Sequence, residues 1–372
     1  MTPRYSKFIT VLFCAFIAGV LLISTLLPDI EFSELENRVL QSPPKLTLET
    51  LQNGKFMTQA EDYVSDHIVG RDFWVALKAW SERLSGKREN NGIYFGKDNT
   101  LISRVEEPDM EKLNKDLGAL DALVSNSQVP VYFGLIPTAA TIWEDKLPTG
   151  APTADERAVI DQLYFSTGAN TIDLVTPLDE HKEEDLYYRT DHHWTSLGAY
   201  YGANALLQAM GLEPLCLSDY TKTTVTDQFY GTLFSSSGVR WLPPDHIDTY
   251  VSDQGISVTS YPNGSPVETP LYDESYLEKK DKYSYFLGGV QGLRVIETQL
   301  EEAPKLLLIR DSYSDSLAPF LTQRFSQIHL FDLRYNATSI QNYIEEHDID
   351  AVVVLYSFSN FISDKNLGLL AR

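Results

Sequence analysis

The sequence is poor in cysteine and has no internal repeat or low-complexity tract. Only Cys14 and Cys216 occur among its 372 residues, which excludes a disulfide framework and any cysteine-rich metal site. Cys14 lies inside an apolar run, so we do not expect the two thiols to meet. The apolar and charged fractions are those of a globular protein, and the length suits one large domain with an insertion or two smaller domains.

Positive charge is also scarce. The chain has 30 lysine and arginine residues against 52 aspartate and glutamate residues, so its formal net charge is -22. A surface of this sign repels phosphate backbones and anionic membranes. Nucleic acid is therefore not expected as a partner.

One long apolar run lies near the N-terminus. Residues 8–27 contain no charged side chain, and 20 helical residues span roughly 30 Å, the thickness of the hydrocarbon core of a bilayer. Arg4 and Lys7 precede the run and acidic residues follow it, which predicts a cytoplasmic segment 1–7 and an extracytoplasmic remainder. The alternative is a cleaved signal peptide. We favour an uncleaved anchor because the run is long and residues 24–28 lack a small-x-small cleavage site.

The rest of the chain alternates strand and helix patterns with one interruption, which predicts an α/β layered domain. Short apolar runs such as Lys305–Ile309 are typical of buried parallel strands. The interruption is rich in Ser, Thr, Gly, Pro, Asp and Tyr, with short alternating pieces, and predicts a mostly β inserted lobe. The predicted organisation is a juxtamembrane linker and helical segment (28–90), a first α/β part (91–214), the inserted lobe (215–303) and a second α/β part (304–372).

Two distant motifs supply the parts of an activated serine nucleophile. Asp191 and His193 belong to an Asp-His-His-Trp segment, and Ser312 follows more than a hundred residues later. A serine hydroxyl needs an imidazole to take its proton and a carboxylate to orient that imidazole. In an extended segment residues i and i+2 face the same side. This spacing predicts His193 as the base and Asp191 as its partner, with His192 pointing away and, like Trp194, in a supporting role.

The position of Ser312 favours it as the nucleophile. It follows a predicted buried strand and precedes a helix, and in open α/β sheets ligands bind at the carboxyl ends of the strands. Amide groups at a helix N-terminus suit a developing oxyanion. Ser314 and Ser316 compete, but both fall within the predicted helix. Helix capping by Ser312 is the simpler alternative, and capping and catalysis can coexist.

Other polar residues near strand ends are candidates for contacts with the oxyanion or the substrate. Asn360 follows the last predicted strand, so its amide is a candidate oxyanion donor, against an ordinary turn asparagine. Arg334 follows the strand before it and is a candidate for a substrate group or for pairing with a nearby acid. Tyr313, next to the nucleophile, is a further candidate.

Two rival interpretations come from the same residues. Asp191, His192 and His193 have the chemistry of metal ligands, but adjacent histidines of a strand face opposite ways, so no metal site is expected. A non-catalytic polysaccharide-binding or scaffold protein is the other class. The predicted lobe contains many aromatic residues, which would support such binding or simply pack the lobe: Tyr220, Phe229, Tyr230, Phe234, Trp241, Tyr250 and Tyr261.

The two motifs, together with segments such as Glu36-Asn37-Arg38 and Asp332-Leu333-Arg334-Tyr335, resemble SGNH-type proteins of the alginate O-acetylation group. The resemblance extends over nearly the whole chain after the apolar run and is strongest to the bacterial branch named for its Asp-His-His-Trp motif. It implies a flavodoxin-like, three-layer parallel sheet in which Asp and His precede Ser, the reverse of ordinary GDSL hydrolases. It also implies transfer of acetyl groups to a polysaccharide acceptor, with acetyl supplied by a multispanning membrane acyltransferase and no cofactor.

The chain departs from that pattern at Arg310, where GDSL-type enzymes have glycine, and a large cation there is expected to narrow or recharge the approach to Ser312. The expected mechanism is ping-pong. Ser312 attacks an acetyl donor, and a sugar hydroxyl deprotonated by His193 resolves the acetyl-serine. Water in place of the sugar would make the protein an acetylesterase, and the catalytic residues alone do not separate these activities.

Overall fold

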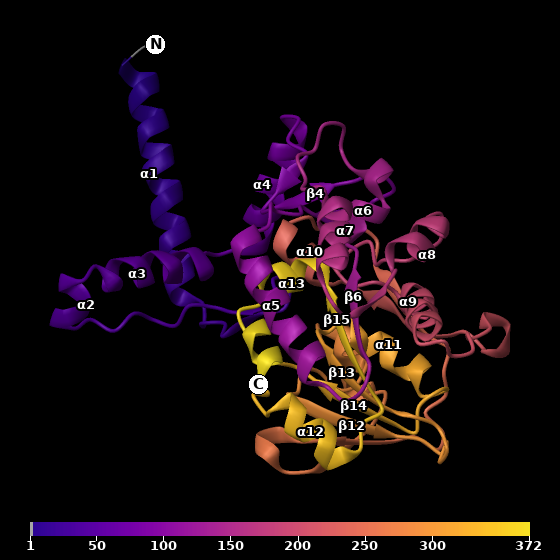
Figure 1. The fold of residues 1–372 in the computed structure, drawn as a ribbon. Coiled ribbons are helices and arrows are strands. Elements are labelled where there is room, and N and C mark those ends of the chain that lie inside the picture. Colours follow the sequence, from indigo (N-terminus) through magenta and orange to yellow (C-terminus); the bar gives the residue numbers. More distant parts are fainter. Residues whose placement is uncertain (1–2) are drawn as a thin grey trace. The chain divides into compact units, whose positions relative to one another are not determined.

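The computed structural model describes residues 3–372, which form two compact units (Figure 1). Unit 1 comprises residues 3–90 and 234–241. Unit 2 comprises residues 91–233 and 242–372. The motif residues singled out above, from Asp191 to Asn360, all belong to unit 2.

Unit 1 begins with a single long helix, α1 (Pro3–Leu26), which is long and apolar enough to cross a membrane. It contains nearly all of the predicted span 8–27. The predicted cytoplasmic segment 1–7 includes residues 1 and 2, which lie outside the described residues, and its remaining residues belong to α1. Three helices lie in the segment that follows, for which we predicted a juxtamembrane linker and a helical segment. The further elements of unit 1 are β1 (Phe32–Ser33), β2 (Arg38–Val39), α2 (Leu48–Gln52), α3 (Lys55–Asp66), α4 (Arg71–Leu84) and β3 (Glu89–Asn90).

A network of ion pairs joins the Glu36-Asn37-Arg38 motif to Asp66 and Arg71 within unit 1. Arg38 pairs with Glu36 at 2.8 Å and with the carboxylate of Asp66. Arg71 pairs with Glu36 and lies 3.5 Å from Asp66. Asp66 is buried, and the hydrogen bond from Arg38 holds the pKa of this carboxyl below its usual value despite burial. The Glu36-Asn37-Arg38 motif thus fixes the strand β2 against the end of α3.

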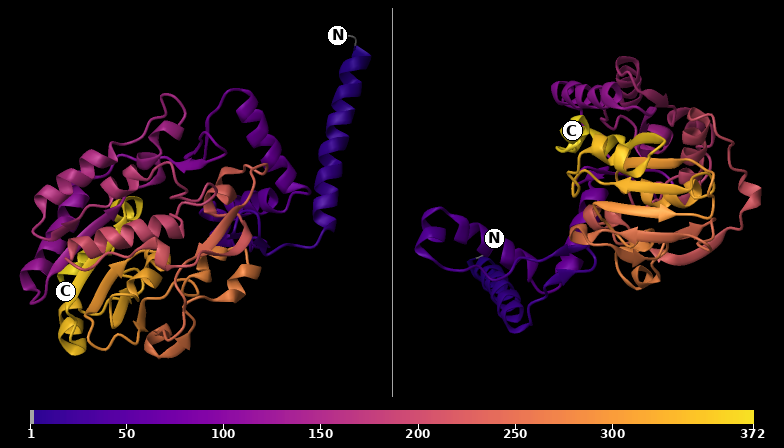
Figure 2. Two further views of the ribbon diagram at one scale, coloured as in Figure 1. Left: turned by 90° about the vertical axis from the view of Figure 1, so that its right-hand side faces the viewer. Right: turned by 60° about the horizontal axis from the view of Figure 1, so that its bottom comes forward.

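The centre of unit 2 is an eight-stranded sheet of order β11-β10-β12-β14-β13-β15-β6-β7. Five of its strands, from β14 to β7, are parallel to one another. Figure 2 shows the orange and yellow strands side by side in this sheet. The strands are β6 (Val131–Ile136), β7 (Asn170–Ile172), β10 (Ser257–Ser260), β11 (Val267–Thr269), β12 (Leu293–Glu297), β13 (Lys305–Arg310), β14 (Gln327–Phe331) and β15 (Ala351–Ser357).

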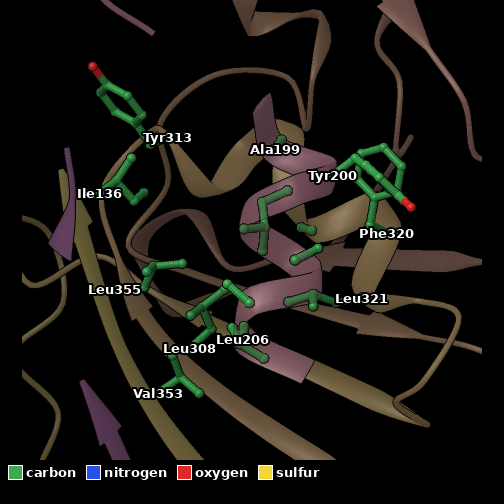
Figure 3. Close-up of a cluster of buried hydrophobic side chains, with 14 of the residues drawn as sticks. Ile136, Ala199, Tyr200, Leu206, Leu308, Tyr313, Phe320, Leu321, Val353 and Leu355 are labelled. Carbon is green, nitrogen blue, oxygen red and sulfur yellow. The ribbon is translucent and has the colours of Figure 1, made fainter. Parts of the chain in front are cut away.

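Helices cover both faces of this sheet because the central strands are apolar on both sides. Leu308 of β13 faces the same core as Val353 of β15, whereas Leu307 and Val352 face the opposite core. One core packs against α8 (Val175–Glu180), α9 (Ser196–Ala209) and α11 (Ser314–Leu321), and the other against α5 (Met110–Asn126), α7 (Glu156–Ser166), α12 (Ile340–His347) and α13 (Phe358–Ser363). Figure 3 shows the first core, to which Leu206 of α9, Leu308 of β13 and Leu321 of α11 all contribute. The predicted three-layer α/β architecture is confirmed.

Antiparallel strands extend the sheet at one edge and correct the expectation of a separate inserted lobe. β10, β11 and β12 all lie within residues 215–303, yet β12 pairs with β14 and β10 pairs with β12. Without β12, the strand β14 would present an unpaired edge. The sheet is therefore mixed and not purely parallel. The rest of the segment lies outside the sheet: β8 (Thr223–Phe229) and β9 (Asp245–Thr249) form a two-stranded ribbon, and residues 234–241 belong to unit 1.

The remaining elements are short. They are β4 (Ile93–Phe95), β5 (Leu101–Ser103), α6 (Ala139–Ile142) and α10 (Thr232–Ser237), together with 3-10 turns. β4 and β5 form an antiparallel hairpin.

Candidate active site

The fold brings Asp191, His193 and Ser312 into one hydrogen-bonded chain. Nε2 of His193 lies 2.8 Å from Oγ of Ser312, and Nδ1 of His193 lies 2.6 Å from Oδ1 of Asp191. Asp191 and His193 are buried, and Ser312 is partly exposed between the end of β13 and the start of α11. These distances suit proton transfer from the serine hydroxyl to the imidazole. Ser314, the nearest rival, is fully buried.

The Asp-His-His-Trp segment is a tight bend and not the extended strand that we expected. Residues 189–193 are bends, closed by a bridge between Tyr187 and Trp194. Oδ1 of Asp191 accepts a hydrogen bond from the backbone N–H of His193 at 2.9 Å as well as contacting its ring. The pairing of Asp191 with His193 thus follows from a turn in which the Asp191 side chain binds the backbone two residues on. It does not follow from the alternation of side chains along a strand, which we had expected.

His192 does not point away from the site, contrary to the sequence prediction. Its ring centroid lies 3.9 Å from that of His193, and its Nδ1 lies 3.5 Å from Oδ1 of Asp191. Nδ1 also lies 2.6 Å from Oγ1 of Thr232. The bend places both imidazoles on the same carboxylate, because the chain reverses there.

The second oxygen of Asp191 is held by residues that the sequence did not single out. Oδ2 accepts hydrogen bonds from the backbone N–H and the hydroxyl of Thr232, at 2.8 and 3.0 Å. Gly231 makes room for this carboxylate, since a Cβ there would lie 2.2 Å from Cβ of Asp191. Gly231 immediately precedes α10, which begins at Thr232, and this short helix has no periodic pattern in the sequence, so only the adjacent Gly-Thr pair could have indicated a close approach.

Tyr283 packs against the ring of His193, and the sequence did not single it out either. The two rings stack with centroids 3.7 Å apart and an interplanar angle of 8°. The hydroxyl of Tyr283 donates to the carbonyl oxygen of Ser312 at 3.0 Å and lies 3.1 Å from Oγ of Ser316. Tyr283 thus fixes the plane of the imidazole and the turn that carries the nucleophile.

Trp194 and Tyr313 join the two motifs. The indole N–H of Trp194 donates to the carbonyl oxygen of Tyr313 at 2.9 Å, and the hydroxyl of Tyr313 donates to the carbonyl oxygen of His192. The Tyr313 hydroxyl is thereby committed to the backbone. Gly202 of α9 lets the indole pack closely, because a Cβ there would lie 2.5 Å from the Trp194 ring.

Burial and charge adjust the acidity of the site. Burial lowers the pKa of His193, and the neighbouring His192 lowers it further, which outweighs the opposite influence of Asp191. Burial alone would raise the pKa of Asp191, but the charges and hydrogen bonds of the two histidines hold it well below its usual value. His193 is therefore neutral near pH 7 and Asp191 is ionised, the states that a general base and its orienting partner need.

Arg310 does not reach the approach to Ser312, which corrects the sequence expectation. Its side chain is fully buried, and Nη2 lies 2.9 Å from Oδ1 of Asp315 in the first turn of α11. Nη1 donates to the carbonyl oxygen of Asp311 at 3.3 Å. The cation thus packs beneath the nucleophile turn, where its charge is met by a buried carboxylate.

Asn360 and Arg334 lie together with Asp311 around a pocket of about 290 Å³. The amide of Asn360 donates to Oδ2 of Asp311 at 2.7 Å, so in this structure it supports the residue before the nucleophile and does not point at an oxyanion. Arg334 forms a two-bond pair with Asp332, at 2.9 and 2.6 Å. This is the pairing with a nearby acid that the sequence left open.

Three candidate ligand atoms for a metal, one each from Asp191, His192 and His193, lie within 4.8 Å of one another. Both ring nitrogens of His193 already take part in the chain from Asp191 to Ser312. An ion bound here would compete with that chain. The arrangement favours nucleophilic chemistry over metal chemistry.

The sequence profile of the DHHW protein family matches residues 117–331, more than half of the chain. The chain belongs to the DHHW family. The matched region contains all three residues of the hydrogen-bonded chain.

Solved structures agree with this assignment. The crystal structure of a DHHW family protein from Eubacterium siraeum is 25% identical, with a TM-score of 0.65, and covers 76% of this chain and 95% of its own. The structure of Bacillus cereus PatB1 is 21% identical, with a TM-score of 0.63, and covers 74% of this chain and 98% of its own. These likenesses establish the shared fold.

A curated relative, the "probable alginate O-acetylase AlgJ" of Pseudomonas putida, is 25% identical over 224 residues. The alignment covers 55% of this chain and 56% of that protein. The chain thus spans about half the length of this relative.

Proposed function

We propose that this protein is an extracytoplasmic O-acetyltransferase that acetylates hydroxyl groups of a cell-envelope or secreted polysaccharide. The observation that carries the proposal is the chain of 2.8 and 2.6 Å contacts from Ser312 through His193 to Asp191. The similarity to the named alginate O-acetylase favours acetyl transfer as the chemistry.

In the proposed mechanism, Oγ of Ser312 attacks the carbonyl carbon of an acetyl donor while Nε2 of His193 takes the hydroxyl proton. The donor's leaving group departs and receives that proton from His193, which leaves an acetyl-serine. A sugar hydroxyl then attacks the acetyl-serine as His193 takes its proton, and Ser312 recovers a proton as the acetylated sugar leaves. The amide of Ser312, near the N-terminus of α11, is our candidate for the oxyanion donor.

The second candidate function is a carbohydrate acetylesterase, in which water resolves the acetyl-serine. The same three residues serve both activities, so the acceptor decides between them. The apolar helix α1 favours transfer, because a protein anchored at the outer face of the membrane would lie where a multispanning acyltransferase could supply acetyl groups. We propose this topology, with the N-terminus cytoplasmic, and such a donor as partner.

The test uses the detergent-solubilised full chain and a chromogenic acetyl ester. We expect Ser312→Ala and His193→Ala each to lower kcat/KM by at least about a thousandfold. Ser166→Ala removes an exposed hydroxyl on α7 and serves as the matched control. If all four proteins cleave the ester equally, or none does, the serine mechanism is wrong. Added oligosaccharides then separate the two activities, since a transferase forms acetylated sugar and an esterase releases acetate.

A further inference from the structure

A large polar groove lies in unit 2, and none of the residues of the hydrogen-bonded chain lines it. Its volume is about 1030 Å³. It is bounded by the first part of β8, the loop that follows β9, Tyr272 with Tyr285, and the two residues after α11, Thr322 and Gln323. The proposed acetyl transfer at Ser312 gives this groove no role.

Aromatic rings line the groove in two groups. Tyr220 and Tyr250 are partly exposed and flank Phe320 of α11, with ring centroids 6.2 and 6.1 Å from it. Tyr272 and Tyr285 stack, with centroids 5.3 Å apart and an interplanar angle of 11°. The apolar C–H faces of sugar rings pack against such aromatic surfaces. The packing of Tyr220 and Tyr250 against Phe320 holds these rings in place before any ligand arrives.

The polar groups of the groove are neutral or negative. Five threonines and three glutamines line it, which can donate to and accept from sugar hydroxyls. Its charged lining residues are three acids, Asp219, Asp253 and Glu274. Two cations adjoin the lining, but Lys222 pairs with Asp248 at 2.8 Å and Arg324 donates to the carbonyl oxygens of Glu213 and Pro214. Binding of carboxylate or phosphate groups relies on cationic donors, above all arginine. The groove therefore repels a polyanionic chain and suits an uncharged or basic one.

Two elements run between the groove and the proposed active site. Asp245, at one end of β9, accepts from the N–H and hydroxyl of Thr190 at 2.8 and 2.6 Å, next to Asp191. Thr249, at the other end of β9, lines the groove, and four residues of strand extend roughly 13 Å. Helix α11 begins two residues after Ser312 and ends at the groove, roughly 12 Å further along its axis. A ligand in the groove would thus lie more than one sugar unit from the nucleophile.

We propose that this groove binds a stretch of the polysaccharide acceptor remote from the hydroxyl that is acetylated, and that this polysaccharide carries no anionic groups. The inference rests on the proposed function, because it assigns the groove to the same acceptor. If the acceptor carries no anionic groups, it is not a polyuronate. Tyr250 supplies the stacking surface and Gln299, exposed at the rim, supplies hydrogen bonds.

The test is isothermal titration calorimetry of the full chain carrying Ser312→Ala, which prevents turnover. The probes are neutral hexasaccharides of glucose, mannose and N-acetylglucosamine, a glucosamine hexasaccharide and a hexagalacturonate. We expect a neutral or glucosamine probe to bind and the hexagalacturonate not to bind. Adding Tyr250→Ala should weaken binding about tenfold, as expected for loss of one stacked ring, and adding Gln299→Ala should weaken it severalfold.

The matched control is Phe165→Ala, which removes a 93% exposed ring on α7, away from the groove. It should bind like the parent protein. The proposal is overturned if hexagalacturonate binds as tightly as the neutral probes, if no probe binds, or if both groove variants bind like the control. Because binding is measured without turnover, a failure here is distinct from a failure of the serine mechanism in the ester assay.

Discussion

The close packing of Gly231 against the side chain of Asp191 gives a direct test of the role of Asp191. Replacing Gly231 with alanine would place a Cβ 2.2 Å from Cβ and 2.3 Å from Oδ2 of Asp191. Non-bonded carbon atoms rest about 3.5–4.0 Å apart, so the carboxylate or the loop must move by more than about 1 Å. A misplacement of about 1 Å in a catalytic group can cost on the order of a hundredfold in rate. We therefore expect Gly231→Ala to lower kcat/KM about a hundredfold.

The assay is hydrolysis of the acetyl ester by the full chain, with thermal unfolding measured on the same sample. Overpacking of this kind costs about 1–3 kcal/mol of stability, so the variant should remain folded at 25 °C. The control is Gly118→Ala in α5, where a Cβ would meet nothing within 4 Å, and it should keep full activity with equal or higher stability. A folded Gly231→Ala protein with the wild-type rate would refute the view that Asp191 must hold its observed position.

Two further predictions concern charge. Because His193 must be neutral to act as base and its pKa is lowered, activity should rise with pH through an acidic limb below about pH 6.5. His192→Gln removes a neighbouring charge, so the limb in a pH–rate profile should move to higher pH, and an unmoved limb would contradict the coupling. Asp315→Leu leaves the buried Arg310 unpaired and should cost about 3–5 kcal/mol in denaturant unfolding, whereas Asp315→Leu with Arg310→Met should recover most of that loss.

Much of the fold was predictable because buried strands carry a strong local signal. The apolar run Lys305–Ile309 became β13, and the run near the C-terminus became β15. Such runs exclude water on both faces, so they specify buried strands without knowledge of their neighbours. The antiparallel strand β12 was not assigned to the sheet, since its place depends on the free edge of β14 and on no local pattern.

The proposed site was likewise predictable only in part. The residue types of Asp191, His193 and Ser312 indicated their chemistry from the sequence alone, because an activated serine needs a base and a carboxylate. The residues that support them could not be identified in this way, since Thr232 and Tyr283 lie in short helical turns, 41 and 90 residues after Asp191 and His193.

The sequence by itself determined which chemical groups this protein has and which segments are buried, because both depend on residue type and short-range pattern. Tertiary structure alone decided where charged and polar groups point. It turned Arg310 inward to Asp315, engaged Asn360 with Asp311, and brought His192 onto the carboxylate that we expected it to avoid. Side-chain direction depends on bends and partners far apart in the chain, and a linear pattern does not carry that information.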